Sequence, residues 1–224
     1  MWRVAEEGFF EKRLKITMMN ITYQIKNAVY VNLTNRCPCN CVFCLRKNGS
    51  GVYGSGSLWL EREPTAKEVV DSLAQWDLSK YPEVVFCGYG EPTERLDTLL
   101  KIAKWLKEHY PHLRIRVNTN GLADQIIGEP TAHRFKGLVD TISISLNTPD
   151  ATEYLAICRP CFGAAAYPAM LRFAEEAKKF VSEVVMTIVG EPVTTLEKQA
   201  ACKAICDRLG VRLRIRPYEK ISRS

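Results

Sequence analysis

Strand and helix patterns alternate along most of this 224-residue chain, and that alternation is the strongest constraint on its fold. A short strand at Ile21–Ile25 and a turn at Lys26–Asn27 come first, and helical patterns then separate six further strands. These expected strands are Ala28–Thr34, Glu83–Gly88, Arg114–Asn120, Thr141–Asn147, Glu183–Gly190 and Arg212–Tyr218. Strands joined by helices in this way run parallel through right-handed crossovers.

The segments between the strands carry apolar residues at helical spacing. One helix begins near Pro64, and shorter helices fit between Leu122 and Gly137 and between Asp150 and Lys179. The clearest apolar stripes are Val69, Val70, Leu73 and Trp76, then Leu96, Leu99, Leu100, Ala103 and Leu106, and finally Cys202, Ile205, Cys206 and Leu209.

Alternation within the strands favours an incomplete (βα)6 TIM-like barrel over a doubly wound sheet. In Thr141–Asn147 the apolar Ile142, Ile144 and Leu146 face one way, and polar side chains face the other. Helices on both faces of a sheet would require continuous apolar runs instead. The sequence therefore predicts an α/β fold with an open polar lumen, preceded by a short N-terminal β-hairpin.

Composition limits the other classes of protein. Apolar residues make up 46% of the chain, and the net charge of +6 is spread rather than gathered in a basic patch, so nucleic-acid binding is not indicated. No apolar run reaches the roughly 20 residues of a membrane span. The first residues carry no cleavable signal pattern, which predicts a cytoplasmic protein. We expect residues 1–20 to be an extension and residues 21–224 to be a single core domain.

Four of the nine cysteines fall within eight residues, directly after the first long strand. In a reducing compartment, clustered thiols indicate a metal site or catalysis. Barrel enzymes place their chemistry in loops at this end of the strands. Taking Cys37, Cys41 and Cys44 gives C-x3-C-x2-C, three ligands for a four-iron cluster whose fourth iron stays open. Cys39 is an additional thiol inside the loop.

This loop resembles the signature of the radical S-adenosylmethionine (SAM) superfamily, with Phe43 at the aromatic position. Gly88–Pro92 is similar to the family's GGEP motif, with Tyr89 in place of its first glycine. Val117–Gly121 is similar to its ribose-binding strand end. The segments NLTNRC, FCLR, FCGYGEPT, NTNG, ISISLN and CRP resemble radical SAM proteins associated with TatD-family nucleases.

The resemblance implies an enzyme that holds a 4Fe–4S cluster on Cys37, Cys41 and Cys44. Such an enzyme reductively cleaves SAM to a 5′-deoxyadenosyl radical, which abstracts hydrogen from a substrate that the sequence does not identify. It also implies an external electron donor such as flavodoxin or ferredoxin. The residues implied in SAM binding are Phe43, Tyr89, Gly90, Glu91, Asn118, Ser145, Asn147 and Arg159. No catalytic side chain is named, because the cofactor performs the radical-generating step.

Structural zinc in a non-enzymatic adaptor is the alternative. Cys41–Cys44 and Cys158–Cys161 are both C-x2-C pairs, the unit of a four-cysteine zinc site. More than a hundred residues separate the two pairs, and zinc leaves Cys37 and the GEP segment unexplained.

The remaining cysteines and the last strand have structural interpretations. We expect Cys202 and Cys206 to be core residues and Cys87 to be a buried thiol. Cys158 and Cys161 could bind a second cluster or cycle as a dithiol, but a pair of inert thiols beside the SAM pocket is the favoured interpretation. Arg212, Arg214 and Arg216 alternate on the last strand. They could form a cationic wall of the lumen, but a solvent-facing row at the barrel opening is the favoured interpretation.

Overall fold

The computed structural model describes residues 19–47 and 54–218, which form one open seven-stranded sheet. The strands lie in sequence order, with β1 and β7 as its two edges. Their bounds are β1 (Thr22–Ile25), β2 (Ala28–Val31), β3 (Glu83–Phe86), β4 (Arg114–Thr119), β5 (Thr141–Ser145), β6 (Glu183–Val189) and β7 (Arg212–Arg216). β1 pairs with β2 antiparallel, and every later neighbour pairs parallel.

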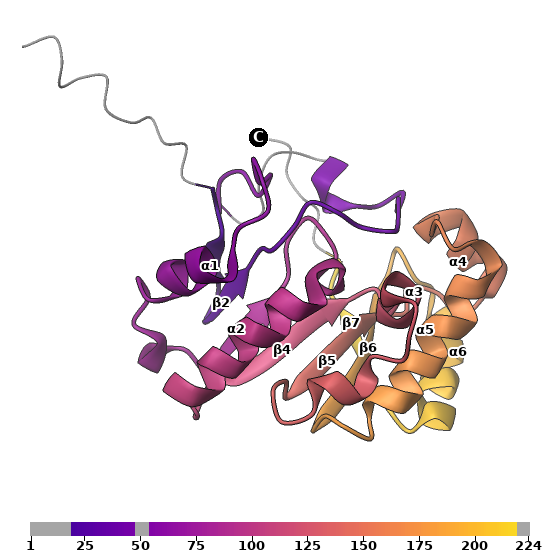
Figure 1. Ribbon diagram of the computed structural model, residues 1–224. Coiled ribbons are helices and arrows are strands. Elements are labelled where there is room, and N and C mark those ends of the chain that lie inside the picture. Colours follow the sequence, from indigo (N-terminus) through magenta and orange to yellow (C-terminus); the bar gives the residue numbers. More distant parts are fainter. Residues whose placement is uncertain (1–18, 48–53, 219–224) are drawn as a thin grey trace, which may run out of the picture.

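Helices follow the parallel strands and cover one face of the sheet (Figure 1). They are α1 (Ala66–Leu73), α2 (Leu96–His109), α3 (Ala123–Ile127), α4 (Ala151–Cys158), α5 (Ala166–Ala177) and α6 (Leu196–Leu209). Short 3-10 turns lie at η1 (Leu45–Lys47), η2 (Leu78–Lys80), η3 (Pro92–Arg95), η4 (Ala132–Phe135) and η5 (Gly163–Ala165). This order confirms the incomplete (βα)6 barrel and its N-terminal hairpin. Residues 1–18 lie outside the described range, so the expected extension stays a prediction.

Local sequence sets where the helices begin and end. Thr65 and Glu68 form a capping box at the start of α1, with each side chain accepting a hydrogen bond from the other residue's backbone N–H. Thr195 caps α6, and Gly210 ends it with a left-handed φ of 67° that glycine adopts without strain. These signals fix where α1 begins and where α6 begins and ends.

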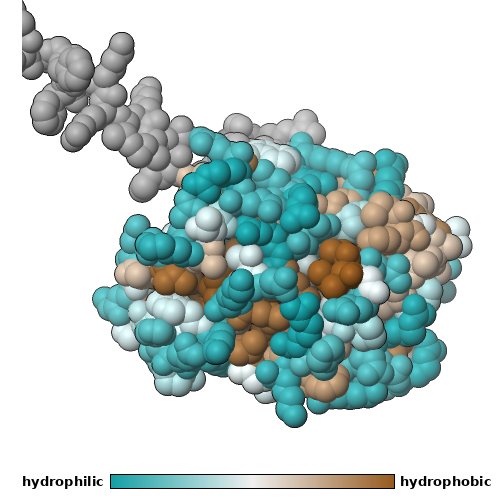
Figure 2. Space-filling model, viewed as in Figure 1, coloured by the Kyte–Doolittle hydropathy of each residue, from teal (hydrophilic) through white to brown (hydrophobic). Residues whose placement is uncertain are grey.

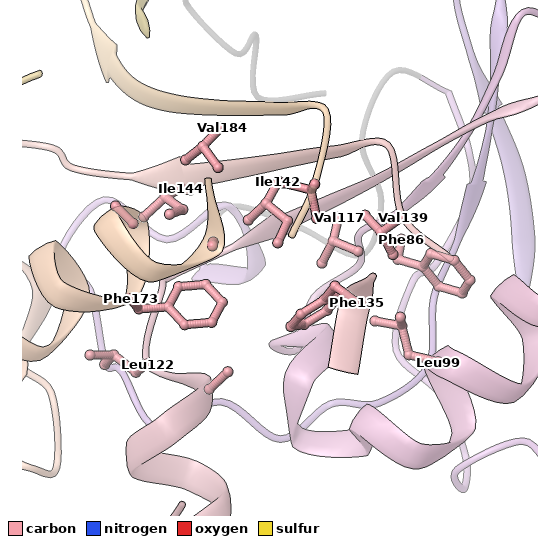
Figure 3. Packing of buried hydrophobic residues seen from close by; sticks show 14 of the residues in the cluster. Phe86, Leu99, Val117, Leu122, Phe135, Val139, Ile142, Ile144, Phe173 and Val184 are labelled. Carbon is pink, nitrogen blue, oxygen red and sulfur yellow. The ribbon is translucent and has the colours of Figure 1, made fainter. Parts of the chain in front are cut away.

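The core lies between the sheet and its helices (Figure 3). Ile142 and Ile144 of β5 and Val117 of β4 point from the sheet toward Phe173 of α5 and Phe135 of η4, and all five are buried. The two phenylalanine rings meet edge to face, with centroids 6.2 Å apart. The apolar half of each strand's alternation is therefore buried under helices, as predicted.

The outer faces of the helices are mostly polar (Figure 2). Hydrophilic residues cover most of the face seen there, and apolar ones gather in small areas near its middle. None of the helices within residues 19–47 and 54–218 combines the length and apolar character that crossing a membrane requires.

Cys202 and Cys206 are fully buried on the inner side of α6, as the sequence predicts. Replacing Cys206 by Ser puts a hydroxyl among apolar neighbours, so the free energy of unfolding should fall by about 1–3 kcal/mol. Urea denaturation measures this change. The matched control is Cys161→Ser, because Cys161 is exposed and should tolerate the change. Equal losses in the two variants would contradict the core placement of Cys206.

Candidate cofactor site

A polar cavity of about 210 Å³ opens at the carboxyl ends of the parallel strands. Its wall includes Gly88 and the segment 90–92 after β3, the segment 118–120 at the end of β4, and side chains of β5, β6 and β7. Four of the residues predicted to bind SAM line it, namely Gly90, Glu91, Asn118 and Ser145. Parallel strands bring these ends to one edge of the sheet, where barrel enzymes have their sites.

Glu91 ties the ends of two strands together. Its Oε1 accepts hydrogen bonds from the hydroxyls of Thr119 (2.7 Å) and Thr93 (2.8 Å). Its Oε2 accepts one from the backbone N–H of Asn120 (2.7 Å). Burial raises the pKa of Glu91, while the hydrogen bonds, led by that of Asn120, act in the opposite direction. The carboxylate is thus held by the protein's own donors and fixes the GEP segment to the end of β4.

Gly90 brings the GEP segment against the chain that enters the cysteine loop. A Cβ at this position would lie 2.2 Å from the carbonyl oxygen of Thr34 and 2.6 Å from that of Arg36. The backbone N–H of Glu91 donates to the same Arg36 carbonyl at 2.8 Å. Only a residue without a side chain allows this approach, so the cysteine loop and the cavity wall form one unit.

The cysteine loop crosses the top of the sheet toward α4 (Figure 1). There it pairs with the chain at the end of that helix: Asn40 N–H donates to the Arg159 carbonyl (3.2 Å) and Val42 N–H donates to the Ile157 carbonyl (2.9 Å). A third backbone bond runs from Cys161 N–H to the carbonyl of residue 38 (2.8 Å). The CRP segment is therefore the second support of the loop.

Four thiols lie next to one another, three on the cysteine loop and one at the end of α4. Cys39 is buried and hydrogen-bonds both Cys37 and Cys41, and Cys158 also hydrogen-bonds Cys41. The bond from Cys158, followed by that from Cys39, lowers the pKa of Cys41. The bond from Cys39 likewise lowers the pKa of Cys37, and the nearby positive charge of Arg46 acts in the same direction. Both effects favour the thiolate form that metal binding needs.

Sequence reasoning missed three of these neighbours. It left Cys158 as an inert thiol beside the pocket, and it did not single out Asn120 or Arg46. In the structure Asn120 Nδ2 lies 3.8 Å from Cys39 Sγ, and Arg46 Nη2 donates to the Cys39 carbonyl at 3.2 Å. Only the C-x2-C spacing around Cys158 hinted at its proximity to the loop.

The donor set fits an iron–sulfur cluster in its chemistry. Cys37, Cys41 and Cys44 are half-buried thiols on one loop, and iron–sulfur clusters are held by such thiolates. Among residues 19–47 and 54–218, however, no three His, Cys, Asp or Glu side chains are arranged to hold a single metal ion. Instead, the Cys39 thiol hydrogen-bonds both Cys37 and Cys41.

The other four predicted SAM residues are not among the residues that line the cavity. Tyr89 meets Trp59 edge to face, with ring centroids 5.2 Å apart. Asn147 donates to Cys158 Sγ at 3.2 Å, and Arg159 donates to the Ala156 carbonyl at 3.3 Å. Phe43 leaves 47% of its surface exposed on the cysteine loop.

The arginines of β7 do not form a uniform solvent-facing row, which was the favoured interpretation. Arg214 is half-buried and lines the cavity, and the exposed Arg216 also contributes to the lining. Arg212 is exposed outside the lining and pairs with Glu183 at 2.7 Å. The open barrel curves enough that the end of β7 faces the same space as Ser145.

The fold is a partial barrel, and its site combines a cysteine loop with a polar cavity at the ends of the strands. Together they define a class of enzymes. The sequence profile of the radical SAM superfamily matches residues 31–205, from the end of β2 into α6. This chain therefore belongs to the radical SAM superfamily, whose members are enzymes that use a 4Fe–4S cluster and SAM. That membership sets aside the zinc adaptor, although the structure does bring Cys158 against Cys41.

Similar proteins agree with this family. A dual-specificity RNA methyltransferase RlmN from Syntrophobacter fumaroxidans is 34% identical over 99 residues, which are 40% of this chain and 26% of that protein. A radical SAM methyltransferase from Sphaerobacter thermophilus superposes with a TM-score of 0.55 at 16% identity, over 89% of this chain and 69% of that one. The structure described as native anSMEcpe with bound AdoMet gives 0.58 at 16% identity, over 87% and 53%. Membership of the TatD-associated group stays a prediction.

Gly90→Ala should lower the free energy of unfolding by about 1–3 kcal/mol, because the new methyl group meets two backbone carbonyls that cannot rotate away. Chemical denaturation of the metal-free protein measures the change. Gly190→Ala is the control: its Cβ would meet only the Ile215 side chain within the tight range, at 3.1 Å, and that chain can turn. A loss in the control as large as that in Gly90→Ala would contradict the close approach.

Proposed function

We propose that this chain reductively cleaves SAM at a 4Fe–4S cluster held by Cys37, Cys41 and Cys44. The resulting 5′-deoxyadenosyl radical then abstracts hydrogen from a substrate. The observation that carries the proposal is the fixed contact between the cysteine loop and the GEP segment through Gly90, Glu91 and Arg36. A cofactor that bridges a cluster and a polar cavity needs these two elements side by side and rigid.

Asn118 supports SAM binding through an unused acceptor. Its Oδ1 is buried and has no hydrogen-bond partner among the described residues, and Asn118 lines the cavity. A buried acceptor without a partner is costly, so a bound donor would relieve it. The ribose hydroxyls and the ammonium group of SAM are such donors. Ser145 offers a second hydroxyl on the same wall.

The residues around the cavity complete the proposed SAM site. The backbone of Tyr89 and Gly90 would hold the methionine amino group, and Arg159 supplies a positive charge for the carboxylate. Phe43 presents an exposed aromatic ring on the cysteine loop, suited to the adenine. Asn147 steadies this arrangement through its bond to Cys158. Glu91 acts here by positioning the GEP backbone, because its oxygens are already taken.

When bound, the cluster and SAM supply the one-electron chemistry that yields the radical. The chain's own part is to ligate, orient and exclude water, so no side chain need act as acid or base. We propose that an external protein such as flavodoxin or ferredoxin donates the electron. We also propose that residues 21–224 form a single radical SAM core domain. This chain covers only 26% of the length of the RlmN protein, and we propose no RNA partner for it.

Anaerobic reconstitution should load about four irons per chain. With dithionite and SAM, the loaded protein should form 5′-deoxyadenosine, measured by chromatography. Replacing Cys37, Cys41 and Cys44 together by Ala should abolish both iron loading and product, because the cluster loses every protein ligand.

Cys39→Ala is the matched variant, since it removes a thiol from the same loop but not a proposed ligand. It should keep both iron and 5′-deoxyadenosine formation. Loss of the cluster in Cys39→Ala alone would overturn the ligand assignment, and a loaded wild-type protein that cannot cleave SAM would overturn the proposed reaction.

A further inference from the structure

Two strands place arginines on the wall of the lumen. Arg116 of β4 lies on the polar face of the sheet, opposite the buried Ile115 and Val117. Arg214 and Arg216 of β7 line the cavity. The positive charges of Arg116, Arg216 and Arg212 all act on Arg214, so Arg116 lies near Arg214 although two strands separate β4 from β7.

Two of these guanidinium groups have a buried N–H with nothing to bind. Arg116 Nη2 donates to Glu83 Oε1 at 2.8 Å, but its Nε has no partner among the described residues. Arg214 Nη2 reaches the Ser143 hydroxyl at 3.3 Å, and its Nε is likewise without a partner in the described part of the chain. Buried donors normally have a hydrogen-bond acceptor, so this part of the lumen suits a ligand that carries acceptor oxygens.

Other positive charges act on Arg214. Burial lowers the pKa of Arg214, and the positive charges of Arg116, Arg216 and Arg212 lower it further. The nearby carboxylates are already engaged. Glu83 pairs with Arg116, and Glu183 pairs with Arg212 at 2.7 Å. Guanidinium forks match the oxygens of carboxylates and phosphates in geometry and in charge.

We propose that Arg116 and Arg214, assisted by Arg216, bind an oxyanion group of the substrate, either a carboxylate or a phosphate. The proposal rests on the function proposed above and adds a substrate class to it. Arg116 precedes Asn118 by two residues on β4, which places it roughly 7 Å farther from the carboxyl edge. The substrate's anion would therefore lie deeper in the lumen than the SAM that Asn118 contacts.

Titration calorimetry tests the site on the cluster-loaded protein with saturating SAM and no reductant, using inorganic phosphate and, separately, succinate as probes. Wild type should bind at least one probe. Arg116→Gln and Arg214→Gln should each weaken that binding by about tenfold or more, because each loses charge-assisted hydrogen bonds. Arg212→Gln is the control: it lies on the same strand but is exposed and paired with Glu183, so it should bind as wild type does.

The carboxylate of SAM is a competing ligand for the same arginines. A second measurement distinguishes it from an oxyanion of the substrate. Without substrate, the SAM dependence of 5′-deoxyadenosine formation measures SAM affinity, and Arg116→Gln and Arg214→Gln should lose much less affinity for SAM than for the probe. A matching loss of SAM affinity would assign the arginines to the SAM carboxylate and overturn the proposal. So would the absence of probe binding in wild type, or an equal loss in Arg212→Gln. Failure of SAM cleavage in every protein would instead count against the proposed function.

Discussion

The close contact between Gly90 and the carbonyls of Thr34 and Arg36 is the constraint on which the rest of the site depends. It joins the loop after β2 to the loop after β3, and the buried carboxylate of Glu91 extends the connection to the end of β4. Three neighbouring strand ends thereby act as one rigid wall. A cysteine loop without this support would be one surface loop among others, with no fixed relation to the polar cavity.

The two faces of the sheet have different roles. The helix-covered face buries residues such as Ile142 and Phe173 and provides stability. The lumen face carries amides, hydroxyls and guanidinium groups, several of which lack partners among the described residues, as Asn118 Oδ1 and Arg214 Nε do. Folding leaves these polar atoms unsatisfied at a cost that bound ligands can offset. Unmet hydrogen-bonding capacity is thus concentrated on the lumen face of the sheet.

Local patterns predicted the strands, the helices and the polar lumen. Apolar residues such as Ile142 recur at every second position in strands, and those such as Leu99 recur at helical spacing. The C-x3-C-x2-C spacing and the GEP segment predicted the family. Contacts between distant segments could not be predicted in this way. Cys158 meets Cys41 only because the end of α4 pairs with the cysteine loop. Arg214 faces the lumen, not the solvent, because the curvature of the open barrel turns β7 inward.

The most direct test of the central claim is anomalous diffraction at the iron edge from crystals of the loaded protein grown without oxygen. The account predicts three irons bonded to the sulfurs of Cys37, Cys41 and Cys44, with the fourth iron free of any protein ligand and facing the Gly90 cavity wall. A cluster bonded through Cys39 or Cys158 in place of one of these, or four protein ligands, would contradict it.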